Sequence, residues 1–121
     1  MRVKLYEYNK CSTCKKALKY LEAKAVNYEK FDIVSKPPSL KDLKTMLEYI
    51  KRGGGSLKNL FNTSGVQYRE LNISDKIKSG LTENEALKML SQNGKLIKRP
   101  FILTDKNGAV GFNVEVWSKL I

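Results

Sequence analysis

The sequence contains no histidine and only two cysteines among its 121 residues. A structural zinc site takes four cysteine or histidine ligands, so this chain alone would need unusual ligands to complete one, and we expect no metal site. Two cysteines are also too few for the disulfide framework that holds many small secreted domains together. The chain is long enough to bury a hydrophobic core without such cross-links, and we expect a single domain over residues 1–121.

Long apolar runs are missing as well. No stretch approaches the length of a membrane-spanning helix, and the N-terminus lacks the apolar segment of a secretory signal. These absences favour a cytoplasmic protein with no membrane attachment. Because the cytosol is reducing, a disulfide between the two cysteines would be transient there.

Negative charge is scarce: 12 Asp and Glu residues stand against 23 Lys and Arg residues, a formal net charge of +11. Such a charge favours acidic partners or anionic substrates through long-range attraction, and it also keeps a protein soluble. The basic residues are scattered along every segment rather than gathered in one block or interleaved with aromatic residues. The sequence therefore predicts no direct recognition of nucleic acid.

The two cysteines lie where the periodicity of the chain changes. Residues 3–8 alternate between two apolar faces, which predicts a strand. Behind the cysteines, apolar residues recur at three- and four-residue steps, which predicts a helix over about 12–25. Its buried stripe would comprise Cys14, Ala17, Leu18, Leu21 and Ala25. Cys11 is thus expected where the strand becomes the helix.

That position has chemical consequences for the thiols. Unpaired backbone N–H groups and the helix dipole favour a thiolate over a thiol at a helix N-terminus, and Lys10, Lys15 and Lys16 add positive charge nearby. We therefore expect a lowered pKa for Cys11 and a less exposed Cys14 one turn further on. This asymmetry predicts an attacking Cys11 and a resolving Cys14.

Two purely structural roles for the cysteine pair stay open. Both residues could be ordinary buried side chains, because free cysteine often behaves as a small hydrophobe. They could also form a structural disulfide, although closing so short a loop removes little entropy from the unfolded chain.

The order of the predicted elements indicates an α/β fold of the thioredoxin-like (glutaredoxin-like) type. A second strand over 28–34 completes a βαβ unit with a parallel pair of strands. A helical insert follows at about 39–92, and an Asn-Gly turn then joins two apolar runs into a hairpin over 101–112. A C-terminal helix is expected from Asn113. The predicted order of elements is therefore βαβ, then the helical insert, then ββα.

Within the insert, three helix boundaries can be predicted from local chemistry. Ser39 is a good N-cap, and Thr82 with Glu85 matches a capping box. The glycines of 53–55 predict a helix end. A further short helix is expected to open at Tyr68.

Four stretches of the sequence, taken together and in order, carry a resemblance. They are Tyr8-Asn9-Lys10-Cys11-Ser12-Thr13-Cys14-Lys15-Lys16-Ala17, Leu60-Phe61-Asn62-Thr63-Ser64-Gly65 with Tyr68-Arg69-Glu70-Leu71, Leu96-Ile97-Lys98-Arg99-Pro100, and Val110-Gly111-Phe112 ahead of Trp117. The chain resembles the ArsC/Spx family, which groups arsenate reductases, Spx-type transcriptional regulators and glutaredoxin-like reductases. The likeness covers nearly the whole chain.

The resemblance implies roles for individual residues. Cys11 matches the family's reactive cysteine, and Arg99-Pro100 matches an Arg-Pro pair in which the proline is cis and the arginine points at the cysteine. Such an arginine would stabilise a thiolate or hold an oxyanion. We expect Cys11, Cys14 and Arg99 to be catalytic. The expected substrate-binding residues are Arg99, Pro100, Ser12, Thr13 and Arg69.

Simpler roles stay open for three of these residues. Arg99 could be a surface charge before a strand, Pro100 a plain strand-starting proline, and Arg69 a helix-surface residue.

The sequence also departs from the family pattern. Glutaredoxin-linked arsenate reductases of this kind use three arginines around the cysteine, and only the one matching Arg99 is clearly present. The second would fall near Asn62 and the third near Phe112. Those reductases typically lack a counterpart of Cys14, whereas Spx-type regulators have it, which favours an internal disulfide as the oxidised state.

Three functions follow from these features. The first is a thiol–disulfide oxidoreductase that needs no tightly bound cofactor and takes glutathione, glutaredoxin or thioredoxin as reductant. The alternative is an Spx-like redox-sensing regulator that binds RNA polymerase, although the sequence has little of the tail typical of such regulators. The third is a glutaredoxin-linked arsenate reductase. We expect a monomer in each case.

Overall fold

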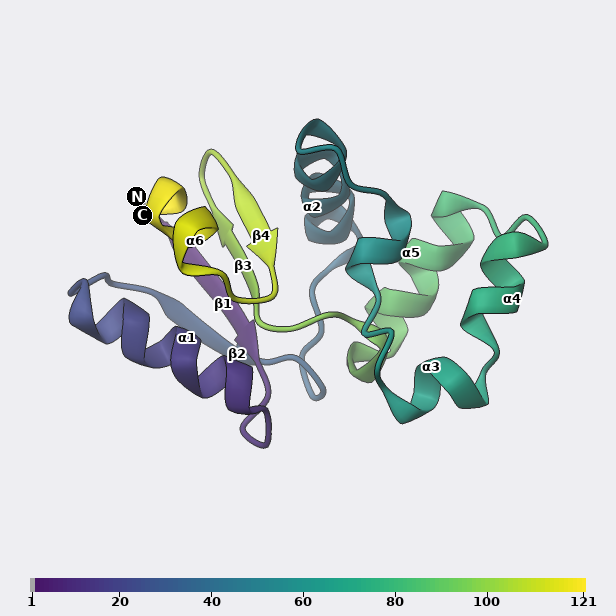
Figure 1. Cartoon of the computed structure of the whole chain (residues 1–121), viewed down its shortest axis with the longest axis horizontal. Coiled ribbons are helices and arrows are strands. Elements are labelled where there is room, and N and C mark those ends of the chain that lie inside the picture. The colour runs from purple at the N-terminus through teal and green to yellow at the C-terminus, as the bar shows by residue number, and fades with distance from the viewer. Residues whose placement is uncertain (1) are drawn as a thin grey trace.

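The computed structural model describes residues 2–121 and is built around a four-stranded sheet in the order β2-β1-β3-β4 (Figure 1). β1 (Val3–Glu7) pairs in parallel with β2 (Glu29–Asp32). β3 (Phe101–Thr104) runs antiparallel to β1 and is joined by a hairpin to β4 (Gly108–Val110). The sheet therefore brings the segment before β3 beside the segment after β1.

One face of the sheet is covered by α1 (Ser12–Ala23) and α6 (Val114–Leu120) (Figure 1). The alternation of β1 supplies Val3 and Leu5 to this face, because successive side chains of a strand point to opposite sides. The buried cluster here comprises Val3, Leu5, Ala17, Leu21, Ile102, Ala109 and Trp117. This layer fixes α1, and with it the cysteine pair, against the sheet.

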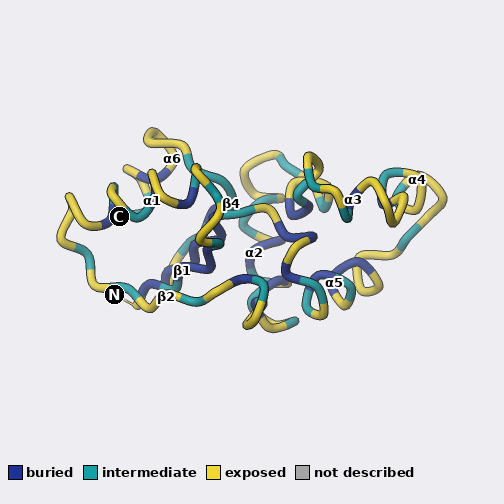
Figure 2. The backbone as a smooth tube through the Cα atoms, turned by 90° about the horizontal axis from the view of Figure 1, so that it is seen from below, coloured by how far each residue is buried: buried dark blue, intermediate teal, exposed yellow. Residues whose placement is uncertain are grey.

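The other face is covered by the helical insert, of which α2 (Leu40–Arg52) lies next to the sheet and α5 (Glu83–Gln92) packs against α2 (Figure 1). Shorter pieces complete it: η1 (Leu57–Leu60), α3 (Val66–Glu70), α4 (Ile73–Lys78) and η2 (Gly94–Leu96). Tyr6, Phe101 and Leu103 from the sheet join the buried cluster on this side. Figure 2 shows buried residues along β1 and at intervals along α5, with exposed residues on the outer turns.

The helix starts predicted at Ser39, Thr82 and Asn113 are confirmed. The Ser39 hydroxyl accepts a hydrogen bond from the Asp42 N–H at 3.2 Å, and Thr82 forms its capping box with Glu85. The Asn113 side chain accepts hydrogen bonds from the first backbone N–H groups of α6. These polar side chains satisfy donors that the helix itself leaves unpaired, which is why the residue type alone located the starts.

Other details of the prediction were wrong. α1 ends at Ala23, and Ala25 is exposed with a φ of 54°, so it does not belong to the buried stripe. α3 begins before Tyr68, and the separate helix α4 was not predicted. Asn72 adopts a left-handed conformation between α3 and α4, which asparagine tolerates better than most residues.

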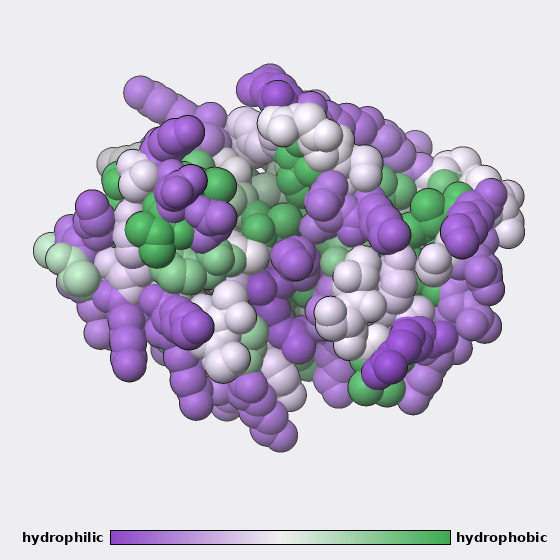
Figure 3. All heavy atoms as spheres, viewed as in Figure 1, coloured by the Kyte–Doolittle hydropathy of each residue, from purple (hydrophilic) through white to green (hydrophobic). Residues whose placement is uncertain are grey.

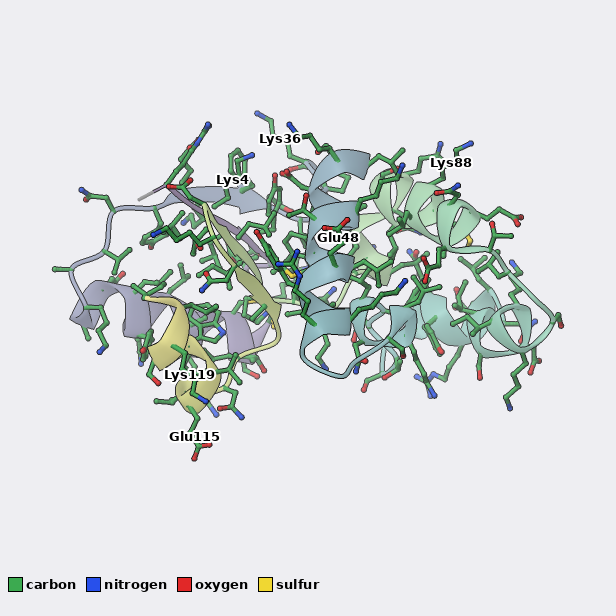
Figure 4. The ribbon with its side chains drawn as sticks, turned by 90° about the horizontal axis from the view of Figure 1, so that it is seen from above. Lys4, Lys36, Glu48, Lys88, Glu115 and Lys119 are labelled. Carbon is green, nitrogen blue, oxygen red and sulfur yellow. The ribbon has the colours of Figure 1, made fainter. Side chains whose placement is uncertain are left out.

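The positive charge of the surface is dispersed. Figure 4 shows Lys36, Lys88 and Lys119 extending outward from different parts of the molecule. Hydrophilic residues cover most of the face seen in Figure 3, with apolar residues in small groups. Within residues 2–121 no helix is both long enough and apolar enough to span a bilayer.

Candidate redox site

Cys11 is the N-cap residue of α1 and ends the turn that connects β1 to α1. Its backbone N–H donates to the Tyr8 carbonyl at 3.0 Å, and its Sγ accepts from the Cys14 N–H at 3.4 Å. Cys11 is partly exposed, whereas Cys14 is 0% exposed, and both are free thiols. The predicted difference in exposure is therefore confirmed.

The pKa of the Cys11 thiol is lowered. Partial burial acts in the opposite direction, but hydrogen bonds from the thiol and the backbone N–H of Cys14 and from the Arg99 guanidinium stabilise the thiolate, as does the charge of Arg99. Lys10, Lys15 and Lys16 are exposed and are not among these causes, so their expected effect on this pKa stays a prediction. Long lysine side chains carry their charge into water, where it is screened.

The pKa of Cys14 is raised to about 12. Burial is the largest cause; a hydrogen bond from the Tyr8 backbone lowers the pKa, while the Cys11 sulfur and the Glu7 carboxylate raise it. Cys14 therefore holds its proton at neutral pH while Cys11 loses its own more readily. The two thiols differ in the way that an attacking and a resolving cysteine would.

Arg99 is brought to the thiols by contacts that lie far apart in the sequence. Its guanidinium carbon lies 4.8 Å from the centre of the Tyr8 ring, and the Arg99-Pro100 bond is cis. The backbone just before it is tied to the insert: the Lys98 N–H donates to the Leu60 carbonyl at 2.8 Å. The insert thus positions the arginine over the cysteine turn.

The remaining predicted site residues lie in different surroundings. Pro100 is buried just before β3, and Ser12 is exposed as the first residue of α1. Thr13 lines a cavity of about 570 Å³ between α1 and the start of α6. Arg69 is exposed on α3, and its side chain forms no hydrogen bond or ion pair within residues 2–121. The substrate-binding roles of these residues stay predictions.

A second cavity, of about 330 Å³, lies directly beside Arg99 and is called the Arg99 cavity below. It is lined by Tyr8, Asn62, Gly65, Val66, Gln67, Glu70, Lys95 and Arg99. Asn62, near which the second arginine of the related arsenate reductases would fall, thus lies in the wall of this cavity. Phe112 does not line this cavity; it packs in an aromatic cluster with Tyr20 and Trp117.

Sequence reasoning missed three charged groups of this region. Glu70 and Lys95 sit in or next to stretches that carried the resemblance, but nothing local indicated that they share a cavity. Glu7 is only 7% exposed and follows Leu5 on the face of the sheet covered by α1. An acidic residue at an inward position of an alternating strand was the signal that could have identified it.

Within residues 2–121, no three cysteine, aspartate or glutamate side chains are grouped in a way that could hold a metal ion. The chemistry available to the site is that of the two thiols, the guanidinium and the polar side chains of the Arg99 cavity.

The fold and the site define a class: a thioredoxin-like protein with two thiols at the start of its first helix and an Arg-cis-Pro pair opposite them. The chain belongs to the ArsC family, whose family model matches residues 6–120. The fold class predicted from the sequence is confirmed by a crystal structure of an ArsC family related protein from Bacteroides fragilis, which is 40% identical. It covers 100% of this chain and 98% of its own, with a TM-score of 0.87.

Two curated relatives extend the comparison. The uncharacterized protein YusI of Bacillus subtilis is 41% identical over 93% of this chain and 92% of its own length. The global transcriptional regulator Spx 2 of Bacillus anthracis is 29% identical over 98% of this chain and 86% of its own length. The relatives of this chain therefore include a global transcriptional regulator.

Proposed function

We propose that the protein is a thiol–disulfide oxidoreductase that uses Cys11 and Cys14 as its redox pair. The observation that carries the proposal is the placement of the two thiols at the start of α1. Cys11 is the partly exposed N-cap, and its Sγ accepts from the Cys14 N–H at 3.4 Å, whereas Cys14 is 0% exposed. Their pKa values accordingly shift in opposite directions, that of Cys11 down and that of Cys14 up. A thiolate is the nucleophile in thiol–disulfide exchange, and a protonated neighbour does not compete with it for the substrate.

In the first step, the Cys11 thiolate attacks one sulfur of a substrate disulfide. The substrate S–S bond breaks, a Cys11–substrate disulfide forms, and the other half leaves as a thiolate that takes a proton from water. Arg99 stabilises the negative charge on sulfur before and during this attack.

In the second step, Cys14 loses its proton and attacks the Cys11 sulfur. The Cys11–Cys14 disulfide forms and the remaining half of the substrate leaves as a thiol. The substrate disulfide has then gained two electrons and the protein has lost two. An external thiol reductant, such as glutathione, glutaredoxin or thioredoxin, restores the two thiols by the reverse exchange.

An Spx-like redox regulator is the second candidate. It is favoured by the similarity to Spx 2, which extends over 98% of this chain, and by the formal charge of +11, which suits an acidic partner surface. In that case RNA polymerase would be the partner, and oxidation of the cysteine pair would change binding rather than turn over a substrate. Arsenate reduction is less favoured, because the Arg99 cavity has a single arginine and includes Glu70, which repels a dianion.

A turnover assay separates these functions. Purified protein is supplied with glutathione and glutaredoxin, or with thioredoxin and its reductase, and is offered a small mixed disulfide and arsenate in separate reactions. Turnover of the disulfide supports the proposal. If neither substrate is turned over but a Cys11–Cys14 disulfide still forms, and RNA polymerase retains only one redox form, the regulator is supported instead.

A further inference from the structure

Glu7, the last residue of β1, is the one charged residue within residues 2–121 that is buried. Its carboxylate accepts no hydrogen bond and forms no ion pair in that part of the chain. Buried polar groups nearly always have a partner, because removing them from water without one costs free energy. A carboxylate kept inside the protein at such a cost is a candidate for a functional group.

The packing of α1 on β1 brings Glu7 and Cys14 together. The short turn between the two elements reverses the chain, so α1 runs back along the strand that precedes it. Leu5 of β1 therefore packs in one buried cluster with Ala17 and Leu21 of α1. One step nearer the turn, the next inward residue of β1 is Glu7 and the next buried residue of α1 is Cys14.

The Cys14 sulfur lies against the end of β1. It accepts a hydrogen bond from the Tyr8 backbone N–H, which belongs to the peptide bond between Glu7 and Tyr8. The charge of the Glu7 carboxylate also reaches this sulfur and contributes to the raised pKa of the thiol. Because Cys14 is 0% exposed, its proton is shielded from bulk water.

The other charged or titratable groups of this region are engaged elsewhere. Asp32 is the register partner of Glu7 on β2, but it is exposed and its carboxylate accepts two backbone N–H groups of the turn that follows. Arg99 acts on Cys11. Cys11 acts on Cys14, but it is bonded to the substrate when Cys14 has to lose its proton. Glu7 is therefore the acceptor that faces Cys14 with its oxygens free.

We infer that Glu7 accepts the Cys14 proton in the second step of thiol–disulfide exchange. This inference rests on the proposed function. The proton of the Cys14 thiol passes to the Glu7 carboxylate while the Cys14 sulfur bonds to the Cys11 sulfur. The bond between Cys11 and the substrate breaks, and its electron pair leaves with the substrate thiolate. Glu7 then returns the proton to water, from which that thiolate is protonated.

A proton acceptor and a simple neighbouring charge have opposite effects at this position. As a charge alone, Glu7 disfavours the Cys14 thiolate, so Glu7→Gln would lower the pKa of Cys14 and speed its attack. As the acceptor, Glu7 takes up a proton that the glutamine amide cannot take up, so the same substitution slows the attack. The sign of the change in rate therefore decides between the two roles.

The test treats reduced protein with one equivalent of dithiobis(nitrobenzoate), a disulfide whose two halves are each released as a coloured thiolate. The first release reports attack by Cys11, and its rate depends on the reagent concentration. The second reports attack by Cys14; its rate does not depend on that concentration, because the step is intramolecular. We expect Glu7→Gln to slow the second release relative to the first at least about tenfold at pH 7.

The pH dependence provides a readout that a structural role would not change. In the wild type the second release should vary little between about pH 6 and pH 8, because the carboxylate takes the proton. In Glu7→Gln it should rise about tenfold per pH unit, since it follows the thiolate fraction of a thiol whose pKa lies well above this range.

Three further variants complete the test. Glu7→Asp keeps a carboxylate and should restore part of the rate that Glu7→Gln loses. Cys14→Ser should lose the second release altogether. Glu48→Gln on α2 makes the same change at an exposed residue and is the matched control (Figure 4).

The outcomes separate the inference from the function on which it rests. A second release in Glu7→Gln that is as fast as in the wild type or faster overturns the inference, and so does a slowed release whose pH dependence is that of the wild type. In both cases the two releases of the wild type still support the redox pair. A wild-type protein without the second release overturns the proposed function and the inference together.

Discussion

The Arg99 guanidinium stacks on the Tyr8 ring, with 4.8 Å between its carbon and the ring centre. This contact joins the segment before β3 to the turn that ends at Cys11. Arg99 therefore reaches the Cys11 sulfur from a different part of the chain, and its hydrogen bond and charge contribute to the lowered pKa of that thiol. The lowered pKa of Cys11 therefore depends on this long-range pairing as well as on the neighbouring Cys14.

Replacing Arg99 by glutamine should raise the pKa of Cys11, because the substitution removes a hydrogen bond and a positive charge that stabilise the thiolate. Thiolate absorbance followed as a function of pH measures the shift, and the reaction with a disulfide at pH 7 should slow several-fold. Lys98→Gln removes a charge from the exposed neighbouring residue and is the control. An unchanged titration in Arg99→Gln would show that the arginine does not act on the thiolate.

The stability of the reduced protein should fall at high pH because of Cys14. The folded protein holds this proton up to a pKa of about 12, whereas the unfolded chain releases it near the ordinary value of 9.0. Between these values the folded state binds more protons, so the contribution of Cys14 is fully present below pH 9.0 and is lost as the pH rises through about 12. Denaturant titrations in the presence of a reductant measure the free energy of unfolding across this range.

The Cys14→Ser variant is the comparison for this pH dependence, because serine occupies a similar volume without titrating there. We expect the stability difference between the wild type and the variant to shrink as the pH rises above 9.0. A constant difference up to pH 11 would contradict the raised pKa.

Trp117 should be a main support of the α6 side of the sheet. It is 0% exposed, its ring centre lies 5.0 Å from that of Phe112, and its indole N–H donates to the Gly111 carbonyl at 3.1 Å. Trp117→Ala should lower the free energy of unfolding by roughly 3–5 kcal/mol, since it leaves a large cavity and an unpaired carbonyl. Val116→Ala on the same helix, at an exposed position, should change stability by less than about 0.5 kcal/mol.

The elements that flank the cysteines were predictable because their signals are local. Alternation over β1, the three- and four-residue steps of α1 and the caps at Ser39 and Thr82 each depend on residues a few positions apart. α4 was not predicted, because Asn72 redirects the chain between two short helices without a proline or glycine to mark the break.

The charged surroundings of the site could not be predicted in the same way. Glu70 and Lys95 meet in one cavity only because the insert folds back, with Phe61 bridging to Ile97. That pairing joins residues far apart in the sequence, and no short pattern encodes it. The resemblance placed Arg99 near the cysteine, but the role of Tyr8 beneath it was visible only in three dimensions.

The most direct test of the proposed mechanism traps the intermediate that it requires. Reduced Cys14→Ser protein is treated with bis(2-hydroxyethyl) disulfide and examined by mass spectrometry, with the Cys11→Ser variant and the wild type in parallel. We expect a stable mixed disulfide on Cys11 in Cys14→Ser, none in Cys11→Ser, and the internal Cys11–Cys14 disulfide in the wild type. A mixed disulfide that forms on Cys14 instead, or no mixed disulfide in Cys14→Ser, would contradict the assignment of Cys11 as the attacking thiol.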